Sequence, residues 1–207
     1  MGRPARFNEA AILAGARRVS AEVGPQNLTI AAVAERSGAP VGSIYHRYKS
    51  RDEILASLWL DVVGEFQERF LAALDGSDPM RSGLAAVRYV CDWVREHPVE
   101  ARLLLLHRRE DFAADGWPLS YRRRARELER RAAESLRAYA LRLIGRDGAP
   151  ELREVRFALV DLPTAALRRD IEAEASISHA SQSLLLETCS FSLRRAARRR
   201  RNTAGRR

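Results

Sequence analysis

Two short predicted helices joined by a tight turn, over residues 29–51, limit what this chain can fold into more than any other feature. Thr29 is a good N-cap, so the pattern predicts a helix over residues 30–37. Gly38 ends that helix, and Pro40 is preorganised for the first turn of the next one. Helices joined in this way form a helix-turn-helix, whose second helix lies in the major groove of DNA.

The second helix has two chemically different sides. Its apolar and aromatic residues are Ile44, Tyr45 and Tyr48, and its polar residues are Ser43, His46 and Arg47. A capping box at residues 50–53 predicts that a long helix starts directly afterwards. Because a helix N-terminus attracts anions and Arg51 adds a full charge there, a DNA phosphate is the expected ligand.

The residue types and their order resemble the DNA-binding domain of the TetR family of bacterial transcription regulators. The resemblance covers about residues 6–60 and rests on Thr29, Ala34, Gly38, Gly42-Ser43-Ile44-Tyr45, Tyr48 and Ser50-Arg51-Asp52-Glu53-Ile54-Leu55. It implies an all-α fold with an N-terminal three-helix helix-turn-helix domain. A C-terminal helical domain for ligand binding and dimerisation is expected to follow.

Carried over residue by residue, the resemblance implies two kinds of DNA contact. Phosphate contacts are expected from Tyr45 and Arg51, with Thr29, Arg47 and Tyr48 as further candidates. Base-edge contacts are expected from Val41, Gly42, Ser43 and His46, and from Ile30 or Ala31 of the preceding helix. Because this set is poor in Arg, Asn and Gln, we expect readout through thymine methyl groups and DNA shape. The alternative for Tyr45 is a place in the core.

Charge is unevenly distributed along the 207 residues, which carry a net charge of +9. Residues 1–51 hold eight basic and three acidic residues, and residues 194–207 hold eight Arg and no acid. Arg3 and Arg6 belong to a basic N-terminal arm that could reach a minor groove, although a frayed end is equally compatible with the sequence. Basic ends fit phosphate contacts, and the alternative is that they only keep the protein soluble.

The remaining residues predict a helical body without a strand signal or an internal repeat. Helices are expected at about 51–74, 80–97, 99–109, 119–144, 151–174 with a kink at Pro163, and 176–197. We expect three regions: a DNA-binding domain over 1–51, an effector-binding and dimerisation domain over 52–197, and a disordered basic tail over 198–207. The resemblance implies a homodimer through the last two helices; the alternative buries both of their faces within one subunit.

The body contains enough aromatic surface for a pocket between helices. The candidate effector-binding residues are Tyr89, Trp93, His107, Phe112, Trp117, Tyr121, Phe157 and Asp161. Each aromatic could instead be a core residue. Asp161 interrupts an apolar run, so a buried carboxylate there would need a ligand or an arginine as its partner, and exposure to solvent would remove it from the set.

The sequence gives no support to an enzyme. It lacks a Gly-rich phosphate loop and a GxSxG motif, and His46, His97, His107 and His179 are too scattered to form a metal site. Cys91 and Cys189 are expected to be core residues. We therefore expect no cofactor, no metal and, without a long apolar stretch, no membrane partner and a cytoplasmic location.

Together these features predict a non-enzymatic regulator that binds a palindromic double-stranded DNA operator as a dimer. We interpret it as a repressor that a small apolar or aromatic molecule releases from DNA. The alternative is a regulator of the same fold that has no small-molecule effector and is constitutive or responds to a protein partner.

Overall fold

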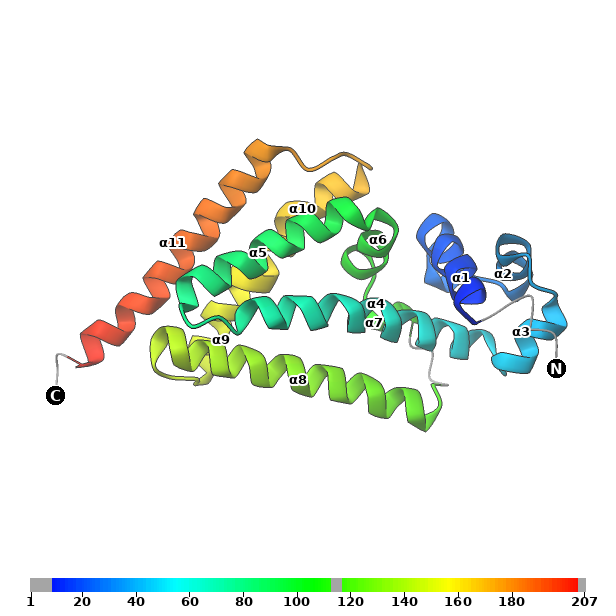
Figure 1. Cartoon of the computed structure of the whole chain (residues 1–207), viewed down its shortest axis with the longest axis horizontal. Coiled ribbons are helices and arrows are strands. Elements are labelled where there is room, and N and C mark those ends of the chain that lie inside the picture. Colours follow the sequence, from blue (N-terminus) through cyan, green and yellow to red (C-terminus); the bar gives the residue numbers. More distant parts are fainter. Residues whose placement is uncertain (1–8, 113–116, 205–207) are drawn as a thin grey trace, which may run out of the picture. The chain divides into compact units, whose positions relative to one another are not determined.

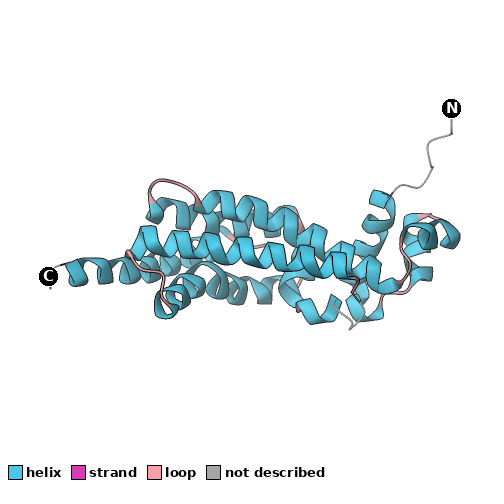
Figure 2. Cartoon of the chain, turned by 90° about the horizontal axis from the view of Figure 1, so that it is seen from below, coloured by secondary structure: helices cyan, strands magenta, loops and turns pink. Residues whose placement is uncertain are grey.

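A computed structural model describes residues 9–112 and 117–204 of the chain, with side chains up to residue 198. Helices and loops make up this described part (Figure 2), so the predicted all-α class is confirmed. The N-terminal arm with Arg3 and Arg6 and the last three residues lie outside it. None of the helices in the described ranges has the length and apolar character needed to cross a membrane.

The chain forms two compact units, which we call unit 1 (Met1–Gly64 with Pro98–Arg126) and unit 2 (Glu65–His97 with Glu127–Arg207). Two long helices contribute residues to both units: α4 (Arg51–Leu74) and α8 (Leu119–Ile144). The predicted functional boundary at residue 51 therefore stays a prediction, because the compact units divide the chain at other places.

Unit 1 contains the predicted helix-turn-helix. The two helices of this motif are α2 (Ile30–Ser37) and α3 (Val41–Arg47), and the other elements are α1 (Glu9–Val23), the 3₁₀ turn η1 (Pro25–Asn27), α6 (Pro98–Leu106) and α7 (Arg109–Phe112). α1 and α2 lie side by side (Figure 1). α6 packs against the other side of α1, where Arg17 Nη1 lies 2.7 Å from Glu100 Oε1. This partly buried ion pair ties α6 to the helix that supports the helix-turn-helix.

Unit 2 is built around α5 (Pro79–Glu96) and α11 (His179–Ala204), which pack against each other (Figure 1). The remaining elements are α9 (Ala149–Arg156), the π-helical segment η2 (Phe157–Asp161) and α10 (Leu162–Glu172). Cys91 of α5 and Cys189 of α11 are fully buried, as expected for core residues. Burial raises the pKa of both thiols, that of Cys189 to about 12, which disfavours the reactive thiolate form.

Several helices have the bounds that local signals predict. α2, α4 and α8 match the expected ranges, and α5 starts one residue earlier than expected, at Pro79. Asp78 caps α5 by accepting hydrogen bonds from the backbone N–H groups of Met80 and Arg81 at 2.8 and 3.1 Å. These bounds were predictable because caps, Gly and Pro act on their immediate neighbours.

The helix around Pro163 differs from the expected simple kink. The chain stays helical there, but η2 has the wider π-helical turn. Pro163 has no backbone N–H, and its ring crowds the carbonyl group four residues earlier, at Leu159. A π-helical turn accommodates this missing hydrogen bond, which accounts for its position directly before the proline.

The last helix is longer than predicted. α11 reaches Ala204, whereas we expected it to end near Ala197 and to be followed by disorder. Ala and Arg are both good helix formers, and the sequence after Ala197 carries no Gly or Pro stop signal before Gly205. The expectation of disorder is thus wrong for residues 198–204, and residues 205–207 lie outside the described part.

The close approach of α1 and α2 generates the first prediction. A Cβ atom added to Gly15 would lie 2.9 Å from Ser37 Cβ and 3.0 Å from the Ser37 backbone nitrogen. We therefore expect Gly15→Ala to lower the free energy of unfolding by about 1–3 kcal/mol through overpacking. Urea unfolding measures the change.

Gly42→Ala is the matched control, because a Cβ atom at Gly42 would meet nothing within 4 Å. It should leave stability unchanged or raise it slightly, since alanine favours a helix. Equal stability of Gly15→Ala and the wild type would show that α1 and α2 are not held at this distance.

Candidate nucleic-acid interface

The buried side of α3 fixes the orientation of the helix-turn-helix. Ile44 is fully buried, as are Val33 of α2 and Leu28 before it. The turn between the helices places Gly38 in the left-handed region, at φ 70°, where glycine has no Cβ penalty. Ala39 is buried beneath the turn. α3 is therefore anchored along one side while its other side remains free.

Local hydrogen bonds hold the two ends of α2. Thr29 Oγ1 accepts a hydrogen bond from the Ala32 backbone N–H at 3.1 Å, which confirms the predicted N-cap. At the other end, Ser37 Oγ accepts one from the Ala39 backbone N–H at 3.2 Å. Serine and glycine together therefore define the turn that sets α3 relative to α2.

The free side of α3 is exposed to solvent. Tyr45 is 52% exposed, so the alternative of a core position is wrong for this residue. The predicted DNA-contacting residues that are also exposed are Val41, Gly42, His46, Thr29 and Ala31, and those that are partly exposed are Ser43, Arg47 and Ile30. Their contacts with DNA remain predictions, and the exposure of their side chains makes such contacts possible.

Tyr48 does not fit the predicted phosphate contact. It is only 2% exposed, and its hydroxyl donates a hydrogen bond to Glu9 Oε1 of α1 at 3.2 Å. Burial raises the pKa of Tyr48 and is the largest cause of the shift, so the hydroxyl stays protonated as this donor. Tyr48 is a core residue that joins the C-terminal end of α3 to α1.

Arg51 has partners inside the protein. Its Nε donates to the carbonyl oxygen of Leu28 at 2.6 Å, and its Nη2 donates to those of Pro25 and Gln26 at 2.8 and 2.6 Å. The guanidinium group thus binds the carbonyl groups of η1 and its flank, while Nη1 lies 3.5 Å from Asp52. Most of its donors are occupied, which leaves little capacity for the predicted phosphate contact.

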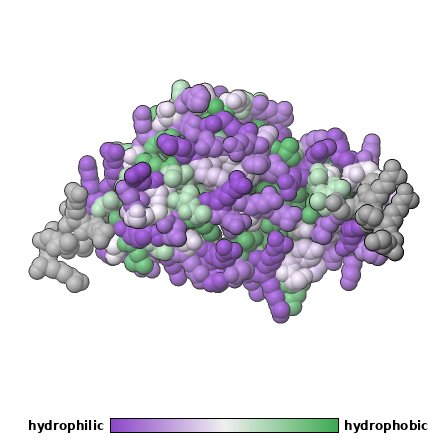
Figure 3. Space-filling model, viewed as in Figure 1, coloured by the Kyte–Doolittle hydropathy of each residue, from purple (hydrophilic) through white to green (hydrophobic). Residues whose placement is uncertain are grey.

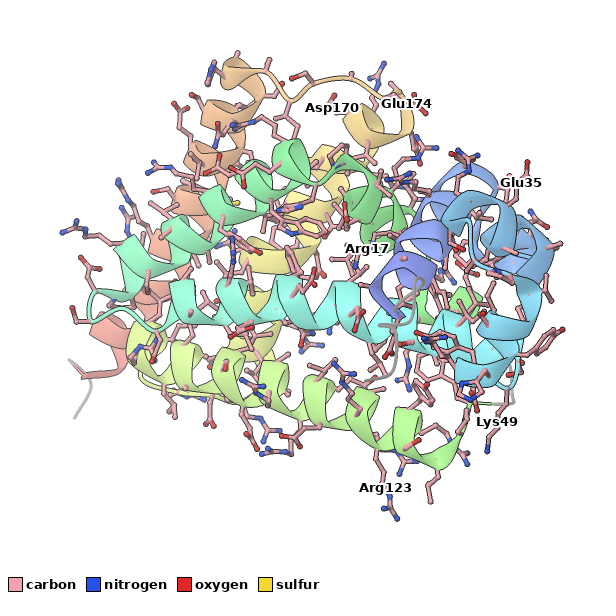
Figure 4. The ribbon with its side chains drawn as sticks, turned by 45° about the vertical axis from the view of Figure 1, so that its right-hand side comes forward. Arg17, Glu35, Lys49, Arg123, Asp170 and Glu174 are labelled. Atoms are coloured by element: carbon pink, nitrogen blue, oxygen red, sulfur yellow. The ribbon has the colours of Figure 1, made fainter. Side chains whose placement is uncertain are left out.

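Lys49 is a candidate that the sequence analysis overlooked. The predicted capping box exists in a modified form: Ser50 Oγ accepts from the Glu53 N–H, and Glu53 Oε2 accepts from the Lys49 N–H at 2.8 Å. The Lys49 side chain is exposed and points away from the ribbon (Figure 4). The signal was a cation directly before the start of α4, where the helix end also attracts anions.

The eight candidate effector residues are divided between the two units. His107, Phe112, Trp117 and Tyr121 belong to unit 1, whereas Tyr89, Trp93, Phe157 and Asp161 belong to unit 2. In unit 1, Trp117 Nε1 donates to the Phe112 carbonyl oxygen, and the Trp117 ring lies 5.8 Å from that of Trp59. These contacts make Phe112 and Trp117 core residues of unit 1.

Asp161 is removed from the candidate set by its exposure. Its Oδ1 lies 3.4 Å from Arg156 Nε, five residues earlier. The intervening π-helical turn brings residues at this spacing onto one side of the helix, whereas an α-helix does so for residues three or four apart. The carboxylate therefore has an arginine partner, as expected, but at the surface and within the same helical segment.

Comparison with known proteins agrees with this geometry. Residues 12–58 match a family model described as bacterial regulatory proteins, tetR family. Among curated proteins, none matches the chain.

Solved structures resemble the chain over most of its length. A putative tetR family transcription regulator from Shewanella sp. PV-4 is 18% identical, with a TM-score of 0.69 over 88% of this chain and 96% of that one. FadR from Bacillus subtilis, in complex with stearoyl-CoA, is 17% identical, with a TM-score of 0.68 over 90% and 97%. The fatty acid degradation regulator FadR from Bacillus halodurans is 13% identical, with a TM-score of 0.68 over 90% of this chain and 97% of that one. At these identities the likeness is one of fold.

The contacts of Arg51 generate the second prediction. Arg51→Ala removes hydrogen bonds to three backbone carbonyl groups, so we expect the free energy of unfolding to fall by about 1–3 kcal/mol. Arg51→Lys should recover only part of the loss, because an ammonium group cannot match the guanidinium fork. Urea unfolding of both variants measures the effect.

Lys49→Ala is the control, because the Lys49 side chain is exposed and should contribute little to stability. Unchanged unfolding of Arg51→Ala together with weaker DNA binding would contradict this interpretation and support a phosphate contact instead.

Proposed function

We propose that the protein is a repressor regulated by a small molecule, because residues 12–58 match the tetR family model and the fold is similar to that of solved tetR family regulators. It binds a palindromic operator as a homodimer, and an effector bound in unit 2 releases it. This role places the protein in the cytoplasm with the DNA and involves no cofactor or enzymatic step.

The single observation that supports DNA binding is the exposed side of α3. Tyr45, His46 and Val41 are exposed on a helix whose opposite side is buried. A helix anchored in this way can enter a major groove without losing its own packing. Lys49 and Thr29 lie close to it in the sequence, where contacts with the DNA backbone would set its position on the duplex.

Homodimer formation is supported by apolar side chains at the surface of unit 2. Leu184 and Phe191 of α11 are 66% and 69% exposed, and Phe157 of η2 is 52% exposed. Phe191 also lines a groove of about 760 Å³, together with Leu84 of α5 and Leu186. Hydrophobic residues break the hydrophilic surface over α11 in Figure 3. Large exposed apolar side chains of this kind favour burial against a second copy through the last two helices.

An effector site is supported by an aromatic cluster in unit 2, which we call the α4–α5 cluster. It consists of Phe66 and Phe70 of α4, Tyr89 and Trp93 of α5, and His97 after it. The Tyr89 hydroxyl is shielded from solvent and has no hydrogen-bond partner among the described residues. Burial raises its pKa, so it keeps its proton and can donate to a ligand. We propose that a largely apolar molecule with one polar group binds here.

The similar FadR structure in complex with stearoyl-CoA suggests which compounds to test first. At 17% identity this likeness extends only to the fold, so long-chain acyl compounds begin the screen and aromatic compounds follow. Binding in unit 2 reaches the helix-turn-helix through α6, which begins directly after α5 in the chain and is tied to α1 by the ion pair of Arg17 with Glu100.

The second candidate function is a regulator of the same fold without a small-molecule effector. In that case the α4–α5 cluster is a filled core. The unpartnered Tyr89 hydroxyl favours the first candidate, because a buried polar group without a partner costs free energy.

The third prediction tests DNA binding through Tyr45. A duplex is first selected from random sequences by the wild-type protein. Tyr45→Phe should then bind this duplex about tenfold more weakly, because it loses one hydrogen bond to a charged phosphate. Fluorescence anisotropy at fixed salt concentration measures the affinity, and thermal unfolding should not change, since the side chain is exposed.

Tyr89→Phe is the control. It also removes one tyrosine hydroxyl group, but from unit 2, and should leave the DNA affinity of the ligand-free protein unchanged. If Tyr45→Phe and Tyr45→Ala both bind as the wild type does, α3 is not the surface that contacts DNA.

The fourth prediction concerns the effector. For a compound that releases the wild-type protein from its duplex, Tyr89→Phe should require about a tenfold higher concentration, because the ligand loses one hydrogen bond. Tyr121→Phe, in unit 1, is the control and should respond like the wild type. If no compound from either chemical class changes DNA affinity, the result contradicts an effector of these classes and favours the second candidate function.

A further inference from the structure

The first two turns of α8 carry an unusual concentration of positive charge. Four arginines lie within five residues, at positions 122, 123, 124 and 126, and residues 117–126 contain no acid. Arg124 Nη2 lies 4.0 Å from Asp61 of α4. Arg122, Arg123 and Arg126 are exposed and have no hydrogen-bond or ion-pair partner among the described residues. We call these three residues the α8 basic patch.

This charge is unfavourable for the helix itself. The N-terminus of a helix carries a partial positive charge, so cations in the first turns destabilise it. Arg122 and Arg126 are also four residues apart on one side of α8, where like charges repel. Because the patch weakens its own helix and has no partner in the part of the chain that the structure describes, its charge is better explained by an external anion than by folding.

The patch belongs to the same compact unit as the helix-turn-helix. The start of α8 is held against α4 by the contact between the Trp117 and Trp59 rings and by the pair of Arg124 with Asp61. Tyr121, on the inner side of the same turn, has a raised pKa, first through burial and then through the nearby charges of Glu53 and Glu9. The first turn of α8 therefore lies near the starts of α4 and α1.

Figure 4 shows the consequence for the surface of unit 1. Arg123 projects outward from the beginning of α8, on the same lower side of the unit as Lys49 in the connection before α4. Tyr121 and Ala125 point inward, and the patch occupies the opposite side of the helix. Arg123 of the patch and Lys49 thus face the same side of unit 1.

We propose that Arg122, Arg123 and Arg126 bind backbone phosphates of the DNA duplex beside the groove that α3 reads. Three exposed guanidinium groups that have no partner among the described residues can each approach a phosphate oxygen and release condensed counterions. The inference rests on the proposed DNA-binding function and adds a second, sequence-independent contact surface to it. Such contacts raise affinity for every duplex without changing the preferred sequence.

The test compares two double variants of the full chain on the duplex selected by the wild-type protein. Arg122→Gln with Arg123→Gln removes two charges from the patch. Arg131→Gln with Arg137→Gln removes two charges from exposed positions of the same helix in unit 2. Both pairs should keep the thermal unfolding midpoint of the wild type or raise it, since none of these side chains is buried.

The first readout is the dependence of affinity on salt concentration. The patch variant should reduce the slope of log affinity against log salt by about 2 for each bound protomer, and the control pair should leave it unchanged. The second readout is ethylation interference, in which the patch variant should lose phosphate positions that remain in the Tyr45→Phe variant.

An unchanged slope, an equal reduction by both pairs or an unchanged interference pattern overturns the inference. In all three outcomes the wild type still binds its duplex, so the proposed function stands. Failure of the wild-type protein to select any duplex would instead overturn the proposed function together with this inference.

Discussion

The packing of one side of α3 is the constraint on which the rest of the helix-turn-helix depends. Ile44 and Tyr48 are buried, and Gly15 lets α1 approach α2 closely enough to form the support beneath them. Because one side of α3 is packed in this way, the opposite side, with Tyr45, is exposed to solvent. A helix of seven residues would not be stable alone, so its shape comes from these tertiary contacts.

The basic residues of unit 1 fall into two groups: one binds acceptors inside the protein, and the other is proposed to bind DNA phosphates. Arg51 satisfies the carbonyl groups of residues 25, 26 and 28 and thereby fixes η1 to the start of α4. Among the described residues, the side chains of Lys49 and of the α8 basic patch have no such partners, and the proposed use of their charge is to bind DNA phosphates. A count of basic residues cannot separate these uses, since the distinction depends on which acceptors the fold brings within hydrogen-bond distance.

Local signals predicted much of the fold, and long-range contacts account for most of what was missed. The caps at Thr29 and Asp78 act within three residues, so the sequence was enough to place α2 and α5. The role of Arg51 depends on acceptors more than twenty residues away, and the burial of Tyr48 depends on Glu9 of α1. The aromatic candidates for the effector site are divided between the two units, and composition could not predict this division because it does not specify which helices become neighbours.

The central claim is that the exposed side of α3 enters the major groove while a second copy does the same on one duplex. Hydroxyl-radical footprinting of the selected duplex, combined with the mass of the complex in solution, tests it most directly. The account predicts two protomers per duplex and two protected backbone segments about 34 Å apart, one helical turn. A single protomer with one protected segment, or protection that persists when Tyr45 and His46 are both replaced by alanine, would contradict it.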